Sequence, residues 1–88
     1  MNEILINAFL DEDGDEYTRA MLMDCIQKNR GKAYRREFNF NQFNVILDFK
    51  AETSVIRDEF ETGEEGEIKM SLKQFEYYLK AKAAEGGS

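Results

Sequence analysis

Apolar positions recur with two different periods along the chain, and the change of period separates predicted helices from predicted strands. In residues 15–30 they recur at helical spacing, for example at Leu22 and Ile26. Acidic residues begin this segment, Lys28 lies in its last turn and Gly31 follows it, an order typical of a helix start and stop. The pattern predicts a helix over residues 15–30.

From Tyr34 onward the period becomes two, as expected for strands that bury one face. The alternation changes register at Asn41-Gln42, which indicates a bulge or a tight turn at that point. The segments with strand character are residues 34–40, 43–49, 54–60 and 66–70. Consecutive strands with short polar connections predict an antiparallel sheet of three to four strands over about residues 34–70.

Two further segments complete the predicted fold. Ser71 followed by Gln74 forms a capping-box pattern at the start of a predicted helix over residues 72–84. Residues 3–11 are compatible with a strand or a short helix, and we favour the helix. The expected fold class is α+β, with the sheet packed by the helices at 15–30 and 72–84.

The length of 88 residues is enough for one domain, which we place at residues 1–85, with residues 86–88 as a flexible tail. The chain has no His and a single Cys, Cys25. Nucleophile pairs that need His, zinc or haem sites with His ligands, disulfides within the chain and cysteine clusters are therefore excluded. We expect a protein without enzymatic activity, catalytic residues, metal ligands or cofactors.

The formal net charge is −6, which favours solubility and disfavours nucleic acid and anionic membranes as partners. No apolar run approaches the roughly 18 residues of a membrane span, and we expect a cytoplasmic protein. The charge is uneven: residues 48–67 contain eight acidic and two basic residues, whereas residues 28–36 contain only basic ones. Such asymmetry favours recognition of a charged partner.

The acidic stretch and the nearby aromatic residues favour a small acidic binding or inhibitor protein of the bacterial immunity or phage anti-defence type. Its partner would be a protein with a basic surface. The residues predicted to bind that partner are Asp58, Glu59, Glu61, Glu64, Glu65, Glu67, Phe40, Phe43 and Tyr77. In addition, residues 38–44 alternate aromatic and amide side chains, and an edge strand of this kind favours a homodimer formed through the sheet edge.

Two alternative functions remain open. The first is a nucleic-acid-binding regulator that uses the basic segment 28–36 with Tyr34 among its cations. The second is metal-dependent cleavage, because Asp58 followed by Glu67-Ile68-Lys69 resembles the PD-(D/E)xK nucleases. That resemblance implies a divalent metal held by the two acids and a lysine beside the attacking water.

A third acidic pattern is one that could bind a cation. Asp11, Asp13 and Asp15 alternate around a glycine, which resembles the opening of an EF-hand calcium loop. The spacing fails further on, since Leu22 stands at the twelfth position, where a bidentate Glu is required. The other interpretation is an acidic helix N-terminus that satisfies free backbone amides.

Overall fold

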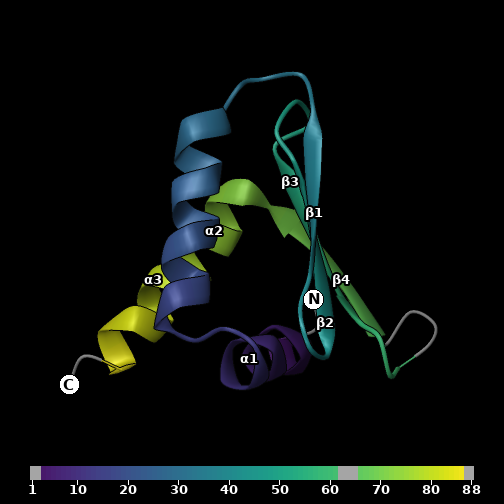
Figure 1. The fold of residues 1–88 in the computed structure, drawn as a ribbon, viewed down its shortest axis with the longest axis vertical. Coiled ribbons are helices and arrows are strands. Elements are labelled where there is room, and N and C mark those ends of the chain that lie inside the picture. Colours follow the sequence, from purple (N-terminus) through teal and green to yellow (C-terminus); the bar gives the residue numbers. More distant parts are fainter. Residues whose placement is uncertain (1–2, 62–65, 87–88) are drawn as a thin grey trace.

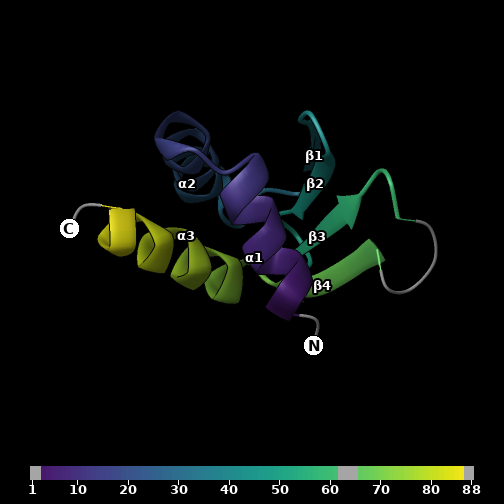
Figure 2. The same ribbon diagram turned by 90° about the horizontal axis from the view of Figure 1, so that it is seen from below.

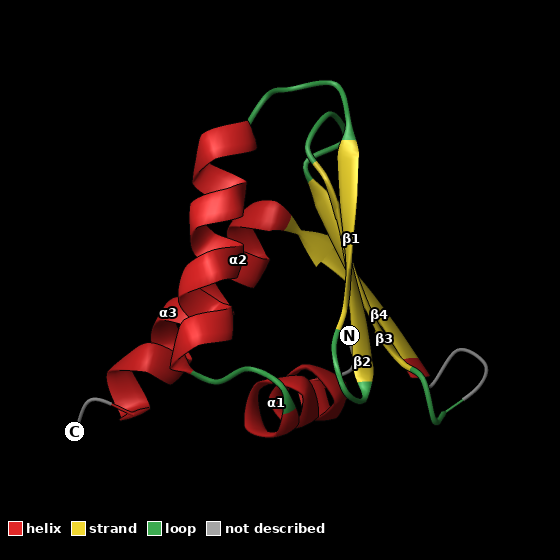
Figure 3. Ribbon diagram, in the orientation of Figure 1, coloured by secondary structure: helices red, strands yellow, loops and turns green. Residues whose placement is uncertain are grey.

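A computed structural model describes residues 3–61 and 66–86, in which a four-stranded antiparallel sheet packs against three helices (Figures 1 and 3). The strands pair in chain order, β1-β2-β3-β4, as a meander. The elements are α1 (Glu3–Glu12), α2 (Glu16–Asn29), β1 (Arg35–Asn39), β2 (Phe43–Asp48), β3 (Thr53–Asp58), β4 (Glu67–Ser71) and α3 (Leu72–Gly86). The predicted α+β fold is confirmed, and the ambiguous first segment is a helix.

Some boundaries differ from the prediction. The C-terminal helix was expected over 72–84 and continues to Gly86, so the first residue of the predicted tail 86–88 belongs to α3, and residues 87–88 lie outside the described part. In that part, no helix is long and apolar enough to cross a membrane.

One face of the sheet is covered and the other is open. Val45, Leu47 and Ile56 alternate along β2 and β3 and are fully buried on the covered face. Figures 1 and 2 show all three helices on this side of the sheet. On the opposite face, Ile46 lies across from Val55, and no described helix covers them. The open face is therefore available to solvent.

Phe9 of α1 lies at the centre of the core. Its ring centroid is 5.7 Å from that of Phe43, 6.0 Å from that of Phe40 and 6.2 Å from that of Phe75. Phe9, Phe43 and Phe75 are fully buried. A single ring therefore joins α1 to β2 and to α3.

α2 has a defined cap at each end. At its start the Asp15 carboxylate accepts a 2.8 Å hydrogen bond from the Thr18 backbone N–H, and this bond lowers the pKa of Asp15. At its end the Asn29 carbonyl accepts from the Lys32 N–H at 3.0 Å. Gly31 has φ of +82°, so residues 29–32 form a type II turn. The chain leaves α2 at this turn and enters β1.

The cap makes stability depend on pH in a defined direction. The folded-state pKa of Asp15 lies below its unfolded value, so its contribution to stability is present above the unfolded pKa and is lost as the pH falls through the folded pKa. Asparagine caps equally well without ionising. We therefore expect Asp15→Asn to flatten the acid limb of unfolding free energy against pH, measured by urea titration. Acid limbs of equal slope in the two proteins would contradict this role.

Candidate functional site

The chain forms a tight acidic turn where β3 ends. The Asp58 Oδ1 atom accepts a 2.9 Å hydrogen bond from the backbone N–H of Phe60, which is the geometry of an Asx turn. The Glu61 N–H donates to the Asp58 carbonyl at 3.3 Å. The strand predicted over 54–60 therefore ends at Asp58. We call the residues Asp58, Glu59, Phe60 and Glu61 the acidic turn.

Two amide side chains beside β2 hold the acidic turn in place. Gln42 donates from Nε2 to Asp58 Oδ2 at 3.3 Å, and the backbone carbonyl of Gln42 accepts from the Glu59 N–H at 2.8 Å. Asn44 donates from its side-chain amide to the Glu59 carboxylate. The acidic turn is therefore bound to the β1–β2 end of the sheet and is preorganised in the free protein.

Phe60 stands out from this turn into solvent, with 77% of its surface exposed. A large aromatic side chain at this exposure costs solubility and gains nothing for the core. The sequence prediction missed it, because Phe60 was assigned to the end of a strand. The signal that identifies it is Asp58 two positions earlier, since an Asp side chain that bonds the second following amide ends a strand.

The start of β4 lies close to the acidic turn. Gly66 lies against the Glu61 carbonyl so closely that a β-carbon at position 66 would collide with it. Glu67, the first residue of β4, forms an ion pair with Arg57 at 3.5 Å. Of the predicted binding acids, Asp58, Glu59, Glu61 and Glu67 thus cluster at this end of the sheet, and Glu64 and Glu65 lie outside the described residues.

The three aromatic residues predicted to bind the partner do not all cluster with these acids. Phe43 is fully buried, so its assignment to a binding surface was wrong: the alternation of β2 turns it toward the core. Phe40 is partly buried against the core. Tyr77 is 64% exposed on α3, and α3 lies on the opposite side of the molecule from the end of β3 in both ribbon views (Figures 1 and 2).

The residues of the nuclease alternative are separated by the pleat of the sheet. Glu67 pairs with Arg57, so it shares a face with Arg57, whereas the next residue, Asp58, belongs to the other face. Both Asp58 oxygens already accept hydrogen bonds. Within residues 3–61 and 66–86, no three acidic or cysteine side chains are grouped to hold a metal ion. The geometry gives the PD-(D/E)xK resemblance no support.

The calcium-like pattern separates into three different contacts. Asp13 is buried, and its Oδ2 accepts the backbone N–H groups of Gln42 and Phe43, each at 2.9 Å. Asp11 forms an ion pair with Lys82 at 2.7 Å, and Asp15 caps α2. The three carboxylates therefore connect different parts of the fold instead of converging on one point.

The basic segment 28–36 lies at the far end of the molecule from the acidic turn, around the loop between α2 and β1 (Figure 1). Part of its charge is paired, since Lys28 contacts Asp24 at 3.1 Å and Arg30 contacts Glu76 at 2.5 Å. The Arg36 guanidinium lies 5.1 Å from the centroid of the Phe38 ring. The molecule thus has an acidic end at the acidic turn and a basic end at the loop between α2 and β1.

No family model, no curated protein and no solved structure matches this chain. The acidic turn combines an exposed aromatic ring, carboxylates held by hydrogen bonds and a fixed backbone, which is a combination suited to binding.

Proposed function

We propose that this protein is a non-enzymatic recognition protein that docks its acidic turn on a basic surface of a partner protein. The observation that supports it is the exposed Phe60 ring on a turn whose neighbouring carboxylates are fixed by hydrogen bonds from Gln42 and Asn44. The proposed cellular role is inhibition by occlusion of the partner's basic site, as in bacterial immunity or phage anti-defence proteins.

Each part of the acidic turn has a physical task in this proposal. An aromatic side chain buries about 150–250 Å² and dominates the energy of an interface when it enters a pocket. The carboxylates of Glu59 and Glu61 steer a basic partner and set the orientation of docking. The hydrogen bonds to Asp58 reduce the entropy lost on binding, because the turn does not need to be ordered by the partner.

Replacing Phe60 tests this proposal. We expect Phe60→Ala to weaken binding to the partner at least about tenfold, because the aromatic anchor is lost. The matched control is Tyr17→Ala on α2, since Tyr17 is 78% exposed but lies outside the turn. Tagged wild type and both variants are incubated with lysate of the native host, and retained proteins are compared by quantitative mass spectrometry.

The partner is the protein retained by wild type and by Tyr17→Ala, lost with Phe60→Ala and released by salt. Release by salt is expected because carboxylates such as that of Glu61 are exposed to solvent. If no retained protein depends on Phe60, or if both variants lose the same proteins, the acidic turn is not the docking site.

A further inference from the structure

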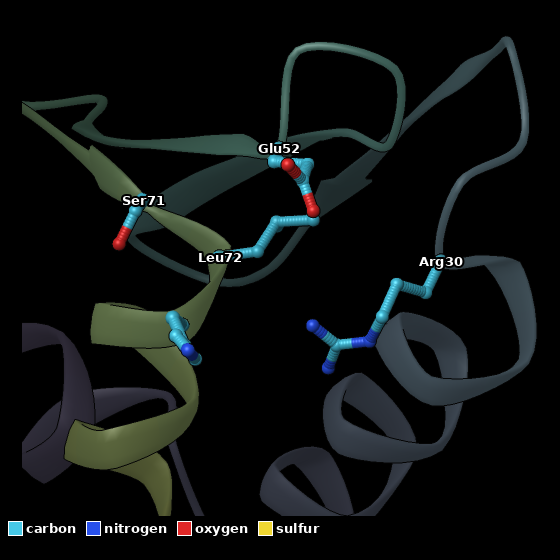
Figure 4. Close-up of a pocket in the computed structure, with 5 residues that line it drawn as sticks. Arg30, Glu52, Ser71 and Leu72 are labelled. Carbon is cyan, nitrogen blue, oxygen red and sulfur yellow. The ribbon is translucent and has the colours of Figure 1, made fainter.

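A groove runs between the end of α2 and the first half of α3. Its upper part is a hollow of about 330 Å³, and its lower part is a hollow of about 400 Å³. The upper part is lined by Arg30, Glu52, Ser71, Leu72 and Lys73 (Figure 4). The lower part is lined by Arg30, Lys73, Glu76, Tyr77 and Lys80. Because Arg30 and Lys73 line both parts, the two hollows form one surface, which we call the basic groove.

The basic groove carries uncompensated positive charge. Glu76 is buried and forms its ion pair with Arg30, so it neutralises one cation of the groove. Lys73 and Lys80 form no ion pair with any carboxylate in the described part of the chain. The remaining acid, Glu52, lines only the upper hollow. The lower hollow therefore presents two free lysines to solvent.

An exposed aromatic residue lies between these lysines. Tyr77 is four residues after Lys73 and three before Lys80, so the three side chains share one face of α3. Tyr77 is 64% exposed. Each hollow is at the lower end of the range of about 300–1,000 Å³ that is typical of small-ligand pockets. Such a surface fits a short acidic segment that carries an apolar side chain.

We propose that the basic groove receives the acidic turn of a second copy of this chain. The turn presents Phe60 among carboxylates, and the groove presents Tyr77 among cations, so the two surfaces are complementary in charge and both contain an aromatic ring. In one molecule α3 and the end of β3 face away from each other (Figure 2). The contact is therefore made between molecules, head to tail.

The geometry of this contact has a consequence for assembly. A head-to-tail contact leaves one free groove and one free turn on every pair, so copies add in a chain unless the rotation closes a ring. Association hides Phe60, and it thus competes with the partner of the proposed function without depending on that partner. Salt weakens it, because the lysines and the Glu61 carboxylate are exposed.

Two complementary variants test the head-to-tail contact. The groove variant is Lys73→Glu with Lys80→Glu, and the turn variant is Phe60→Ala with Glu61→Lys. All four positions are exposed, and far-ultraviolet circular dichroism verifies that each variant folds. Sedimentation velocity at low salt is expected to show wild type growing in mass with concentration and returning to monomer at high salt. Each variant alone is expected to remain a monomer.

Mixing the two variants gives the decisive result. The groove variant keeps an intact turn and the turn variant keeps an intact groove, so an equimolar mixture is expected to form one-to-one dimers and nothing larger. A monomeric wild type, or a mixture that stays monomeric, would overturn the inference. Association of either variant alone would also overturn it and would indicate pairing of β1 edges. If wild type is monomeric but captures a partner through Phe60, the proposed function remains and the head-to-tail contact is wrong. If wild type self-associates but captures no other protein through Phe60, only the proposed function is contradicted.

Discussion

Asp13→Ala is expected to lower the free energy of unfolding by about 2–4 kcal/mol. The Asp13 carboxylate accepts hydrogen bonds from the backbone N–H groups of Gln42 and Phe43, at 2.9 Å each, and it lies 9% exposed beneath the β1–β2 turn. Alanine leaves both donors without this acceptor, and the charged acceptor makes the bonds stronger than neutral ones. Urea unfolding followed by circular dichroism gives the change.

The control for Asp13 is the acid two positions earlier. Asp11 forms an ion pair with Lys82 at the surface, its side chain being 63% exposed, and such pairs contribute about 0–1 kcal/mol. Asp11→Ala is therefore expected to change stability little. Asp13→Asn keeps one carbonyl acceptor and is expected to fall between the two. Equal destabilisation by Asp11→Ala and Asp13→Ala would show that stability falls because a negative charge is removed, and not because the two backbone hydrogen bonds are lost.

Phe9→Ala is expected to destabilise the fold by about 3–5 kcal/mol. The ring of Phe9 contacts those of Phe43 and Phe75 and is fully buried, so alanine leaves a cavity at the junction of α1, the sheet and α3. A domain of this length has a total stability of about 4–13 kcal/mol. Loss of this single ring thus removes a substantial share of the total stability.

Ile4→Ala on the same helix is the matched control for Phe9→Ala. Ile4 is 83% exposed, so its removal takes little apolar surface out of the core and is expected to change stability only slightly. The midpoint of thermal unfolding is compared for the two variants and wild type. A midpoint of Phe9→Ala close to that of wild type would mean that α1 contributes little to the cooperative fold.

Much of the fold follows from patterns that act over short distances. The period of two in residues 34–49 predicted strand structure with a bulge or a tight turn at the register shift, Asn41-Gln42, and the structure has β1 and β2 with a turn at those residues. The capping pattern at Ser71 is realised as a 3.0 Å bond from the Gln74 N–H to its hydroxyl. These features could be predicted because each depends on residues a few positions apart.

The contacts that join distant segments could not be predicted in this way. Asp13 bonds to residues about thirty positions later, and Arg30 pairs with Glu76 across 46 positions. Acidic residues are common in this chain, and the sequence does not distinguish a carboxylate that accepts buried amides from one in solvent. Such pairings depend on how the helices lie on the sheet, which periodicity does not specify.

The candidate site was predicted in part. The acids Asp58, Glu59 and Glu61 were singled out from their charge, with Phe40, Phe43 and Tyr77 as the expected aromatic contacts, but the aromatic residue on the acidic turn is Phe60. Phe43 belongs to the same alternating set as Val45 and Leu47, so the pattern already favoured its burial. The basic groove was missed because its cations come from two separate places in the sequence, Arg30 at the C-cap of α2 and Lys73 and Lys80 on α3.

The order of the elements along the chain affects how the protein is made. Each strand pairs with its predecessor, so the sheet can assemble from hairpins as the polypeptide leaves the ribosome. Phe75 and Leu79, which complete the burial of the sheet's covered face, belong to α3 and are synthesised after all four strands. Until they emerge, that face remains in contact with water, and the nascent chain is most exposed to chaperones and to aggregation during this interval.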